Sequence, residues 1–186
     1  MRTSTKWTTK YQIGSIFLSH LEAIGISFVF LSVAFYILMT KNVIREILSI
    51  IFILVYFGTI YSRAHKFATF DLKDYTPTKA DIKKAFLGGV FISLSYVAVL
   101  IGYRLIWEFC SVDGVLLSLP SFIYSLFFYV YTIPYNGIMG ISHGEIMWYS
   151  KVLMIAVPPL ATSLGYFMGL RKISIMEKIS TLIYEK

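Results

Sequence analysis

Charged residues and cysteine are scarce in this chain of 186 residues. Aspartate, glutamate, lysine and arginine together make up 15% of it, whereas hydrophobic residues make up 57%. Soluble domains have about a quarter of their residues charged, so the composition indicates an integral membrane protein. The single cysteine, Cys110, excludes a disulfide framework and a cysteine-based metal site. No Pro-, Ser- or Gln-rich linker divides the chain, so we expect one membrane domain over residues 1–186.

Motifs of catalysis are missing as well. The sequence has no HExxH zinc motif and no phosphate-binding glycine loop. Two His-x-Glu pairs, His20 with Glu22 and His143 with Glu145, match part of a zinc-deaminase site. That site also needs a Pro-Cys-x-x-Cys segment, which is absent. We therefore predict no cofactor and no metal site, and a non-enzymatic role is favoured.

The chain does have four long apolar runs, at residues 13–39, 43–61, 85–107 and 152–170. A hydrocarbon core of about 30 Å requires about 20 helical residues, and each run is close to that length or longer. No cleavage site follows the first run, so we expect it to be retained as a helix. The sequence predicts an all-α integral membrane protein with four transmembrane helices.

A fifth apolar stretch, residues 121–133, is shorter and has two faces. On a helix its apolar side chains fall within an arc of about 140°, and Ser, Thr and Tyr occupy the other side, with Phe128 as the exception. Pro120 and Pro134 bracket the stretch, and its length of about 20 Å is less than the hydrocarbon thickness. We predict an amphipathic helix that lies at the outer interface or is re-entrant. Its apolar face consists of Phe122, Ile123, Leu126, Phe127, Val130 and Ile133.

Positive charge decides between four crossings and a fifth one that would run from residue 115 to 133. With four, 13 Lys and Arg residues face the cytoplasm and 4 face the outside; with five, the numbers are 10 and 7. Cytoplasmic segments carry the excess of Lys and Arg, so we predict four crossings of the cell membrane with both termini cytoplasmic. Residues 62–84 then form a cytoplasmic loop, and residues 171–186 form an amphipathic cytoplasmic tail.

The expected partners follow from the same pattern. The net charge of +7 is spread over short segments between apolar runs, which suits the lipid bilayer and its anionic cytoplasmic lipids better than nucleic acid. Small residues recur every four positions in three runs. Such stripes let transmembrane helices pack closely, and a membrane protein partner or a homo-oligomer is compatible with them. The stripes are Ser15, Ser19, Ala23 and Ser27; Ala85, Gly89 and Ser93; and Ala161, Gly165 and Gly169.

Two helix-start signals lie in the polar segments. Thr78 and Asp81 form a Thr-x-x-Asp signal after Pro77, so the third helix is expected to begin before the membrane. Ser174 and Glu177 form a capping box at the start of the tail.

The clearest candidate site lies at the inner end of the first helix. Glu22 precedes a long uncharged run, and an ionisable group at that depth needs a partner, which Arg63 or Lys66 can supply. Two interpretations are open. One is an interfacial ion pair, and the other is a proton or ligand contact formed by His20 and Glu22. The second His-x-Glu pair is expected in a solvated loop.

Residues 165–178 read Gly-Tyr-Phe-Met-Gly-Leu-Arg-Lys-Ile-Ser-Ile-Met-Glu-Lys. This run matches G-Y-x-x-G-x-[KR]-x-I-S-x-x-E-K, and the chain thereby resembles a family of small uncharacterised integral membrane proteins of clostridial-type bacteria. Lys66 and Asp71 match that family's K-x4-D motif, although the tryptophan, arginine and asparagine around the motif are replaced by His65, Phe70 and Lys73. The resemblance implies a similar four-helix architecture and no assigned activity. It adds Asp71 to the candidate binding residues.

Three functional hypotheses follow. The first is a non-enzymatic scaffold or modulator of another membrane component, because packing stripes and amphipathic end helices are plentiful. The second is a small transporter subunit or permeation component that uses Glu22 and His20, with the Pro158-Pro159 break in the fourth helix. The third is an enzyme acting on lipid, which has little support in the sequence.

Overall fold

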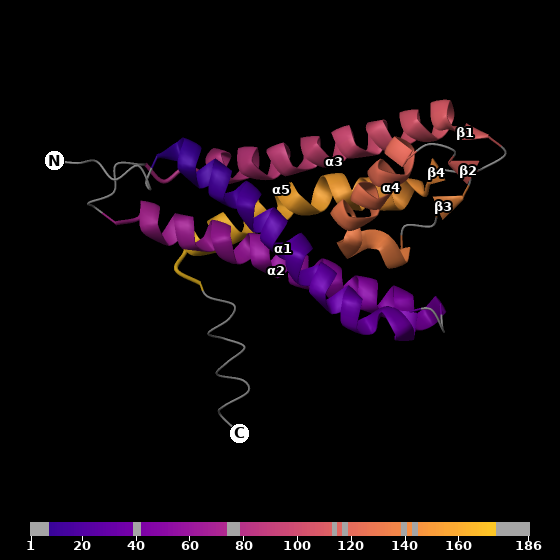
Figure 1. Ribbon diagram of the computed structural model, residues 1–186. Coiled ribbons are helices and arrows are strands. Elements are labelled where there is room, and N and C mark those ends of the chain that lie inside the picture. Colours follow the sequence, from indigo (N-terminus) through magenta and orange to yellow (C-terminus); the bar gives the residue numbers. More distant parts are fainter. Residues whose placement is uncertain are drawn as a thin grey trace, which may run out of the picture.

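The chain forms a bundle of long helices in the computed structural model, which describes residues 8–38, 42–73, 79–112, 115–116, 119–138, 141–142 and 145–173 (Figure 1). The long helices are α1 (Thr9–Leu38), α2 (Asn42–Asp71), α3 (Ile82–Cys110) and α5 (Trp148–Leu170). The segment between α3 and α5 contains the short elements β1 (Ser111–Val112), β2 (Val115–Leu116), α4 (Leu119–Tyr131), the 3-10 helix η2 (Ile133–Ile138), β3 (Ile141–Ser142) and β4 (Glu145–Ile146).

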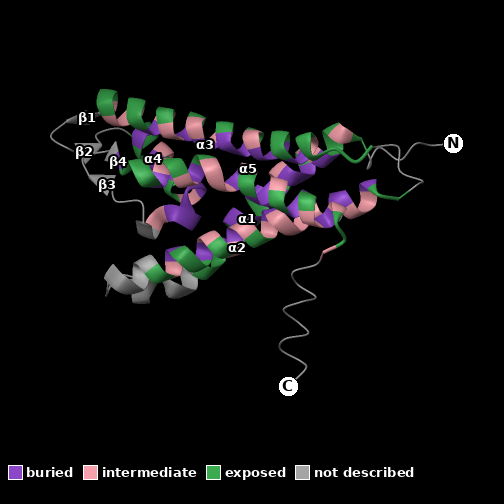
Figure 2. Ribbon diagram, turned by 180° about the vertical axis from the view of Figure 1, so that it is seen from behind, coloured by how far each residue is buried: buried purple, intermediate pink, exposed green. Residues whose placement is uncertain are grey.

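Helices α1, α2, α3 and α5 are long and apolar enough to cross a membrane. The prediction of an all-α membrane protein with four transmembrane helices is therefore confirmed, and each observed helix overlaps its predicted run. Many large apolar side chains stay exposed on the outward sides of the bundle, and buried residues follow the inward sides (Figure 2). This distribution suits a bundle whose outer surface contacts lipid.

Helix α2 is longer than the sequence indicated. It continues through residues 62–71, which the prediction placed in the loop 62–84. This segment contains no proline or glycine, and its side chains Ala64, Phe67 and Ala68 are buried in the core. Tertiary packing therefore extends the helix through a stretch whose charges suggested a solvated loop.

Helix α3 begins at Ile82, and Asp81 acts as its N-cap. The Asp81 Oδ1 atom accepts a hydrogen bond of 2.9 Å from the backbone N–H of Lys83. Thr78, the other residue of the predicted start signal, lies outside the described residues. So do Ser174 and Glu177, and with them most of the predicted tail.

The transmembrane helices define two ends of the bundle (Figure 1). The terminal end holds the start of α1, the end of α2, the start of α3 and the end of α5; the hairpin end holds the end of α3 and the start of α5. Because α3 ends where α5 begins, the segment between them does not cross the bundle. The five-crossing alternative is therefore wrong. Towards the hairpin end, α1 and α2 diverge from α3 and α5, and α4 and η2 lie between the two pairs.

Helix α4 has the two predicted faces except at Tyr129, which is exposed, and Ile133, which lies in η2 and is buried; its polar face is the one that packs on the protein. Ser121, Ser125, Phe128 and Tyr131 are buried. The apolar side chains Phe122, Ile123, Leu126 and Phe127 are 47–61% exposed. A helix on the membrane surface would turn its polar face to water, so this orientation favours the re-entrant interpretation, in which the apolar face meets lipid.

Two contacts fix where α4 lies and where it stops. The Tyr124 hydroxyl donates to the carbonyl of Val99 in α3 at 3.2 Å, and Gly102 leaves the space for it, since a Cβ there would collide with the Tyr124 hydroxyl. The helix ends at Tyr131 because Pro134 has no N–H to continue the ladder. The chain then turns through η2 and returns to the hairpin end, where β3 pairs with β4.

Glycines bring the transmembrane helices into backbone contact. A Cβ built on Gly89 would lie 2.5 Å from Pro159 Cα of α5, and one built on Gly165 would lie 2.4 Å from the backbone oxygen of Tyr61 in α2. All residues of the three predicted small-residue stripes are buried. The stripes therefore act as packing seams, although Gly165 and Gly169 of α5 pack on α2 and not on the other stripes.

A proline in α5 is matched by a serine in α3. Pro159 has no N–H, so the carbonyl of Ile155 loses its intrahelical donor. The Ser93 hydroxyl supplies the missing donor, at 2.7 Å from the Ile155 oxygen. Helix α5 therefore continues through Pro158 and Pro159, so the predicted break is not observed, and a hydrogen bond from the neighbouring helix replaces the one that Pro159 cannot form.

Gly165→Ala is expected to destabilise the protein because the new methyl group would collide with the Tyr61 backbone. Overpacking of this kind costs about 1–3 kcal/mol. Gly58→Ala in α2 is the matched control, since nothing lies within 4 Å of a Cβ there. Thermal unfolding in detergent compares the stability of the two variants. If Gly165→Ala is as stable as Gly58→Ala, Gly165 is not in close contact with the Tyr61 backbone.

Ser93→Ala is expected to cost about 1–3 kcal/mol, because it leaves the Ile155 carbonyl, at a partly buried contact, without a donor. The same substitution should cost less in a Pro159→Ala background, where residue 159 regains an N–H for that carbonyl. A double-mutant cycle on the free energy of unfolding measures the difference. Equal costs in both backgrounds would show that Ser93 does not compensate for the proline.

Candidate functional site

The five residues selected from the sequence lie in separate places. Glu22 and Arg63 contact each other, Asp71 lies at the terminal end, and His20 lies in the middle of the bundle. Lys66 is exposed on α2. The structure therefore does not combine them into one site, and each location has its own chemistry.

Glu22 and Arg63 form an ion pair on the outer side of α1 and α2. Arg63 Nη2 donates to Glu22 Oε2 at 2.6 Å, and the side chains are 35% (Arg63) and 52% (Glu22) exposed. The alternative in which Glu22 faces the bundle interior is therefore wrong. His20 is buried, and two residues along a helix are about 200° apart, so His20 and Glu22 face opposite sides of α1.

Asp71, the last residue of α2, joins all four transmembrane helices at the terminal end. Its carboxylate is fully buried, and Gln12 Nε2 of α1 donates to Oδ1 at 2.7 Å. The Tyr166 hydroxyl of α5 donates to Oδ2 at 2.5 Å. Lys84 Nζ of α3 lies 3.3 Å from the same oxygen and supplies the opposite charge. We call Gln12, Asp71, Lys84 and Tyr166 the Asp71 network.

The Asp71 network is closed by backbone groups. The Tyr166 hydroxyl accepts a hydrogen bond of 3.1 Å from the N–H of Asp81, and Lys84 Nζ also donates to the carbonyl of Lys79. Both oxygens of the carboxylate accept hydrogen bonds from within the protein. This arrangement makes Asp71 a structural joint between helices, and a buried charge of this kind is tolerated because it is paired and hydrogen-bonded.

Five ring side chains meet in the middle of the bundle. We call them the His–Tyr cluster: His20, Tyr56, Tyr96, Tyr131 and Tyr135. Four have no exposed surface, and Tyr131 is 8% exposed. Tyr56 and Tyr96 stand at the middle of α2 and α3, about 21 Å of helix from either end. Tyr131 and Tyr135 reach this level through α4 and η2, so the re-entrant segment completes the cluster.

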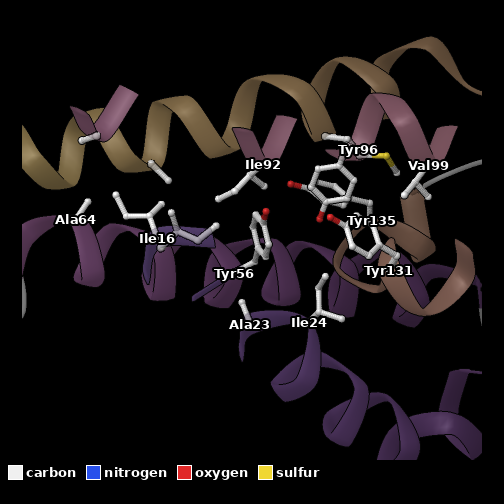
Figure 3. Close-up of a cluster of buried hydrophobic side chains, with 14 of the residues drawn as sticks. Ile16, Ala23, Ile24, Tyr56, Ala64, Ile92, Tyr96, Val99, Tyr131 and Tyr135 are labelled. Carbon is white, nitrogen blue, oxygen red and sulfur yellow. The ribbon is translucent and has the colours of Figure 1, made fainter. Parts of the chain in front are cut away.

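The rings of the His–Tyr cluster pack edge to face. The His20 ring centroid lies 5.6, 5.2 and 5.1 Å from those of Tyr56, Tyr96 and Tyr131, with interplanar angles of 71–87°. The Tyr135 ring lies 5.9 Å from Tyr56 and 5.7 Å from Tyr96. Figure 3 shows the four tyrosine rings gathered in one group with their hydroxyl oxygens close together.

Hydrogen bonding within the His–Tyr cluster is incomplete. His20 Nδ1 and the Tyr56 hydroxyl are 2.8 Å apart, and the Tyr131 hydroxyl is 2.5 Å from Ser95 Oγ. His20 Nε2, the Tyr96 hydroxyl and the Tyr135 hydroxyl are buried and form no hydrogen bond of normal geometry among the described residues, although the Tyr96 hydroxyl interacts with that of Tyr56. Leaving a buried donor or acceptor unsatisfied costs about 1–3 kcal/mol. The cluster therefore presents three polar atoms that can bind a polar guest.

The chemistry of the His–Tyr cluster suits binding. It offers hydroxyl groups and one imidazole nitrogen, and no carboxylate, lysine or arginine belongs to it. Within the described ranges, no group of three His, Cys, Asp or Glu side chains could hold a metal ion. Hydrogen bonding to a guest is the interaction that these groups supply.

The sequence analysis selected His20 as a candidate but none of the four tyrosines of the His–Tyr cluster. Tyrosines in apolar runs are as typical of an interfacial belt as of a buried cluster. One signal was available, because Tyr56 and Tyr96 stand near the middle of long apolar stretches, far from either interface. Tyr131 and Tyr135 carry no such signal, since their position depends on the path of α4 and η2.

A serine-hydrolase string also occurs in the chain. Residues 140–144 read Gly-Ile-Ser-His-Gly, which matches Gly-x-Ser-x-Gly. A nucleophile elbow requires a strand, a sharp turn and then a helix. Ser142 instead ends β3, which pairs with β4 as a two-residue hairpin. The backbone here is not that of an elbow, and His143 lies outside the described residues.

Asp71→Asn and Glu22→Gln are expected to differ strongly in their effect on stability. Asp71→Asn leaves the nearly buried Lys84 without its counter-charge, which costs about 3–5 kcal/mol. Glu22→Gln breaks an exposed pair, which is worth about 0–1 kcal/mol. Thermal unfolding in detergent measures both. A loss for Asp71→Asn as small as that for Glu22→Gln would mean that Asp71 does not hold the helices together.

Comparisons with known proteins assign no role to any of these residues. No protein-family model matches the chain, and neither a curated protein nor a solved structure matches it. The functional conclusion is therefore drawn from the geometry of the His–Tyr cluster.

Proposed function

We propose that the protein is a small transporter subunit or permeation component whose solute site is the His–Tyr cluster. The observation that carries this proposal is the set of three buried polar atoms without a hydrogen bond of normal geometry: His20 Nε2, the Tyr96 hydroxyl and the Tyr135 hydroxyl. Phenylalanine at positions 96 and 135 would fill almost the same volume without an unsatisfied hydroxyl. A guest that accepts and donates hydrogen bonds accounts for polar groups in a place where they otherwise destabilise the bundle.

The broken elements around the cluster support the same function. Transporters form binding sites near the middle of the membrane with discontinuous helices, because irregular backbone at that depth is stable only where it faces protein or a cavity. Here α4 stops at Tyr131, against His20. The proline pair of α5 is held by Ser93, less than one turn of α3 from Tyr96. One helix end, that of α4, and one missing intrahelical hydrogen bond, in α5, therefore lie beside the cluster.

The proposed orientation follows the distribution of positive charge. Both termini face the cytoplasm of a cell, and the hairpin end faces outwards. The Asp71 network then closes the cytoplasmic end, and the re-entrant segment lies on the side from which a solute enters. Exposed basic residues at the terminal end support contact with anionic lipid headgroups; they include Lys66, Lys83, Arg171 and Lys172. The family resemblance remains a prediction of shared architecture.

The scaffold or modulator hypothesis loses part of its support. The small-residue stripes were one of its motivations, beside the amphipathic end helices, and these stripes are occupied by helix contacts within the chain, such as Gly89 on Pro159 and Gly165 on Tyr61. The version of the transport hypothesis that paired Glu22 with His20 changes too, because Glu22 faces outwards. His20 keeps its place in the proposal, now with the tyrosines as its partners.

Tyr96→Phe and Tyr135→Phe are expected to weaken solute binding and flux while leaving stability unchanged or higher. Each removes one hydrogen bond to the solute, and the loss of such a bond corresponds to about a tenfold change. Flux of neutral, cationic and anionic solutes is measured in proteoliposomes, and ligand-induced thermal shifts are measured in detergent. Tyr149→Phe, at an exposed position, is the matched control.

Two results would overturn the proposal. One is that no solute of any class shows flux above empty liposomes or shifts the melting temperature. The other is that a transported solute responds equally to Tyr96→Phe and Tyr149→Phe. In either case the scaffold hypothesis would be preferred, and co-purification in mild detergent would test it.

A further inference from the structure

We infer that the solute held by the His–Tyr cluster is a small uncharged molecule that both donates and accepts hydrogen bonds. This inference rests on the proposed function and adds the chemical class of the solute. It follows from three properties of the cluster: the charges around it, the hydrogen-bonding groups in it and the spacing of its rings.

The His–Tyr cluster offers no counter-charge to an ion. Glu22 faces away from it and is paired with Arg63. Asp71 lies at the end of α2, about 22 Å of helix from Tyr56, and is paired with Lys84. A desolvated ion without a partner is strongly disfavoured in an apolar interior. The bundle interior therefore selects against charged solutes at this level.

Aromatic faces do not replace the missing counter-charge. A cation gains from the face of a tyrosine ring, but the rings here meet edge to face. The interplanar angles are 87° for His20 and Tyr56, 71° for His20 and Tyr96, and 87° for Tyr96 and Tyr135. The faces are largely covered by neighbouring ring edges, so the cluster is not an open aromatic cage for an organic cation.

The unpartnered atoms use their full hydrogen-bonding capacity only with a guest that has both kinds of group. A tyrosine hydroxyl donates and accepts, and an imidazole nitrogen does one or the other according to its tautomer. An anion can accept from all three atoms but leaves the hydroxyl oxygens without a donor, and an ammonium group can donate to all three but leaves the hydroxyl protons without an acceptor. Water, ammonia, urea and small polyols have both kinds of group.

Ring spacing limits the size of the guest. The ring pairs within the cluster that involve His20, Tyr96 or Tyr135 have centroids 5.1–5.9 Å apart. Such spacing is that of rings in direct contact, so a guest enters the cluster only if the rings move apart. The separation needed grows with the size of the guest, so urea or glycerol requires less of it than a sugar or a nucleoside.

The test uses the full chain in proteoliposomes, with urea and glycerol as uncharged probes and choline and phosphate as charged ones. Light scattering after an osmotic step gives the permeability for urea and glycerol, and labelled choline and phosphate give ion uptake. We expect urea or glycerol to cross faster than in empty liposomes. The permeability above that of empty liposomes should be about tenfold lower for Tyr96→Phe and for Tyr135→Phe than for the wild-type protein. Tyr149→Phe should leave it unchanged.

The outcomes separate this inference from the proposed function. Choline or phosphate uptake that depends on Tyr96 and Tyr135, without urea or glycerol flux, overturns the inference and leaves the proposed function standing. No flux of any probe and no thermal shift with any of them counts against both. Thermal unfolding of the phenylalanine variants checks folding, and a variant that melts below the wild-type protein shows that its hydroxyl had a structural partner, which also overturns the inference.

Discussion

The buried carboxylate of Asp71 is the interaction on which the arrangement of the bundle depends. A carboxylate that the protein buries has no water to accept hydrogen bonds from, so it must find all its partners in the protein. Asp71 finds them on three other helices, through Gln12, Lys84 and Tyr166. Because each partner comes from a different helix, the carboxylate is satisfied only when all four transmembrane helices are in place.

The two ends of the bundle are held together by different means. At the terminal end the Asp71 network and the contacts of Gly165 and Gly169 bring α2 and α5 close at the level of their backbones. Towards the hairpin end α1 and α2 diverge, and the space between the helix pairs is filled by α4 and η2 (Figure 1). These two elements pack through small polar side chains such as Ser121 and Ser125 and through Phe128 and Ile133, whereas Phe122, Ile123, Leu126 and Phe127 of α4 face outwards. The inserted segment thus joins the two helix pairs at the hairpin end.

The sequence predicted the parts of this fold that depend on local pattern. Run length and the distribution of Lys and Arg were sufficient for four crossings, and the alternation of residues 121–133 was sufficient for a two-faced helix. The pattern did not show which face of α4 meets protein, since the same amphipathic sequence fits a surface helix and a re-entrant one. The site was harder to predict, because its residues come from elements far apart in the sequence. Gln12 is near the start of α1 and Asp71 at the end of α2, and His20 is in α1 whereas Tyr135 is in η2. Their meeting depends on how α1, α2 and η2 cross, which no local pattern encodes.

The distribution of satisfied and unsatisfied polar groups is the strongest reason to assign a structural role to the Asp71 network and a binding role to the His–Tyr cluster. At the terminal end Asp71, Tyr166 and Lys84 complete one another's hydrogen bonds, and the result is a joint. At the middle of the bundle the hydroxyls of Tyr96 and Tyr135 form no hydrogen bond of normal geometry in the described structure, although they are equally buried. A protein that needed only packing at this level would be more stable with phenylalanine at both positions, because the unsatisfied hydroxyls lower its stability. Real proteins depart from such consistency mainly at functional sites. The loss of stability from unsatisfied hydroxyls therefore occurs where a solute is proposed to bind. The Asp71 network, which fixes the helices, lies at the end of the bundle, away from that site.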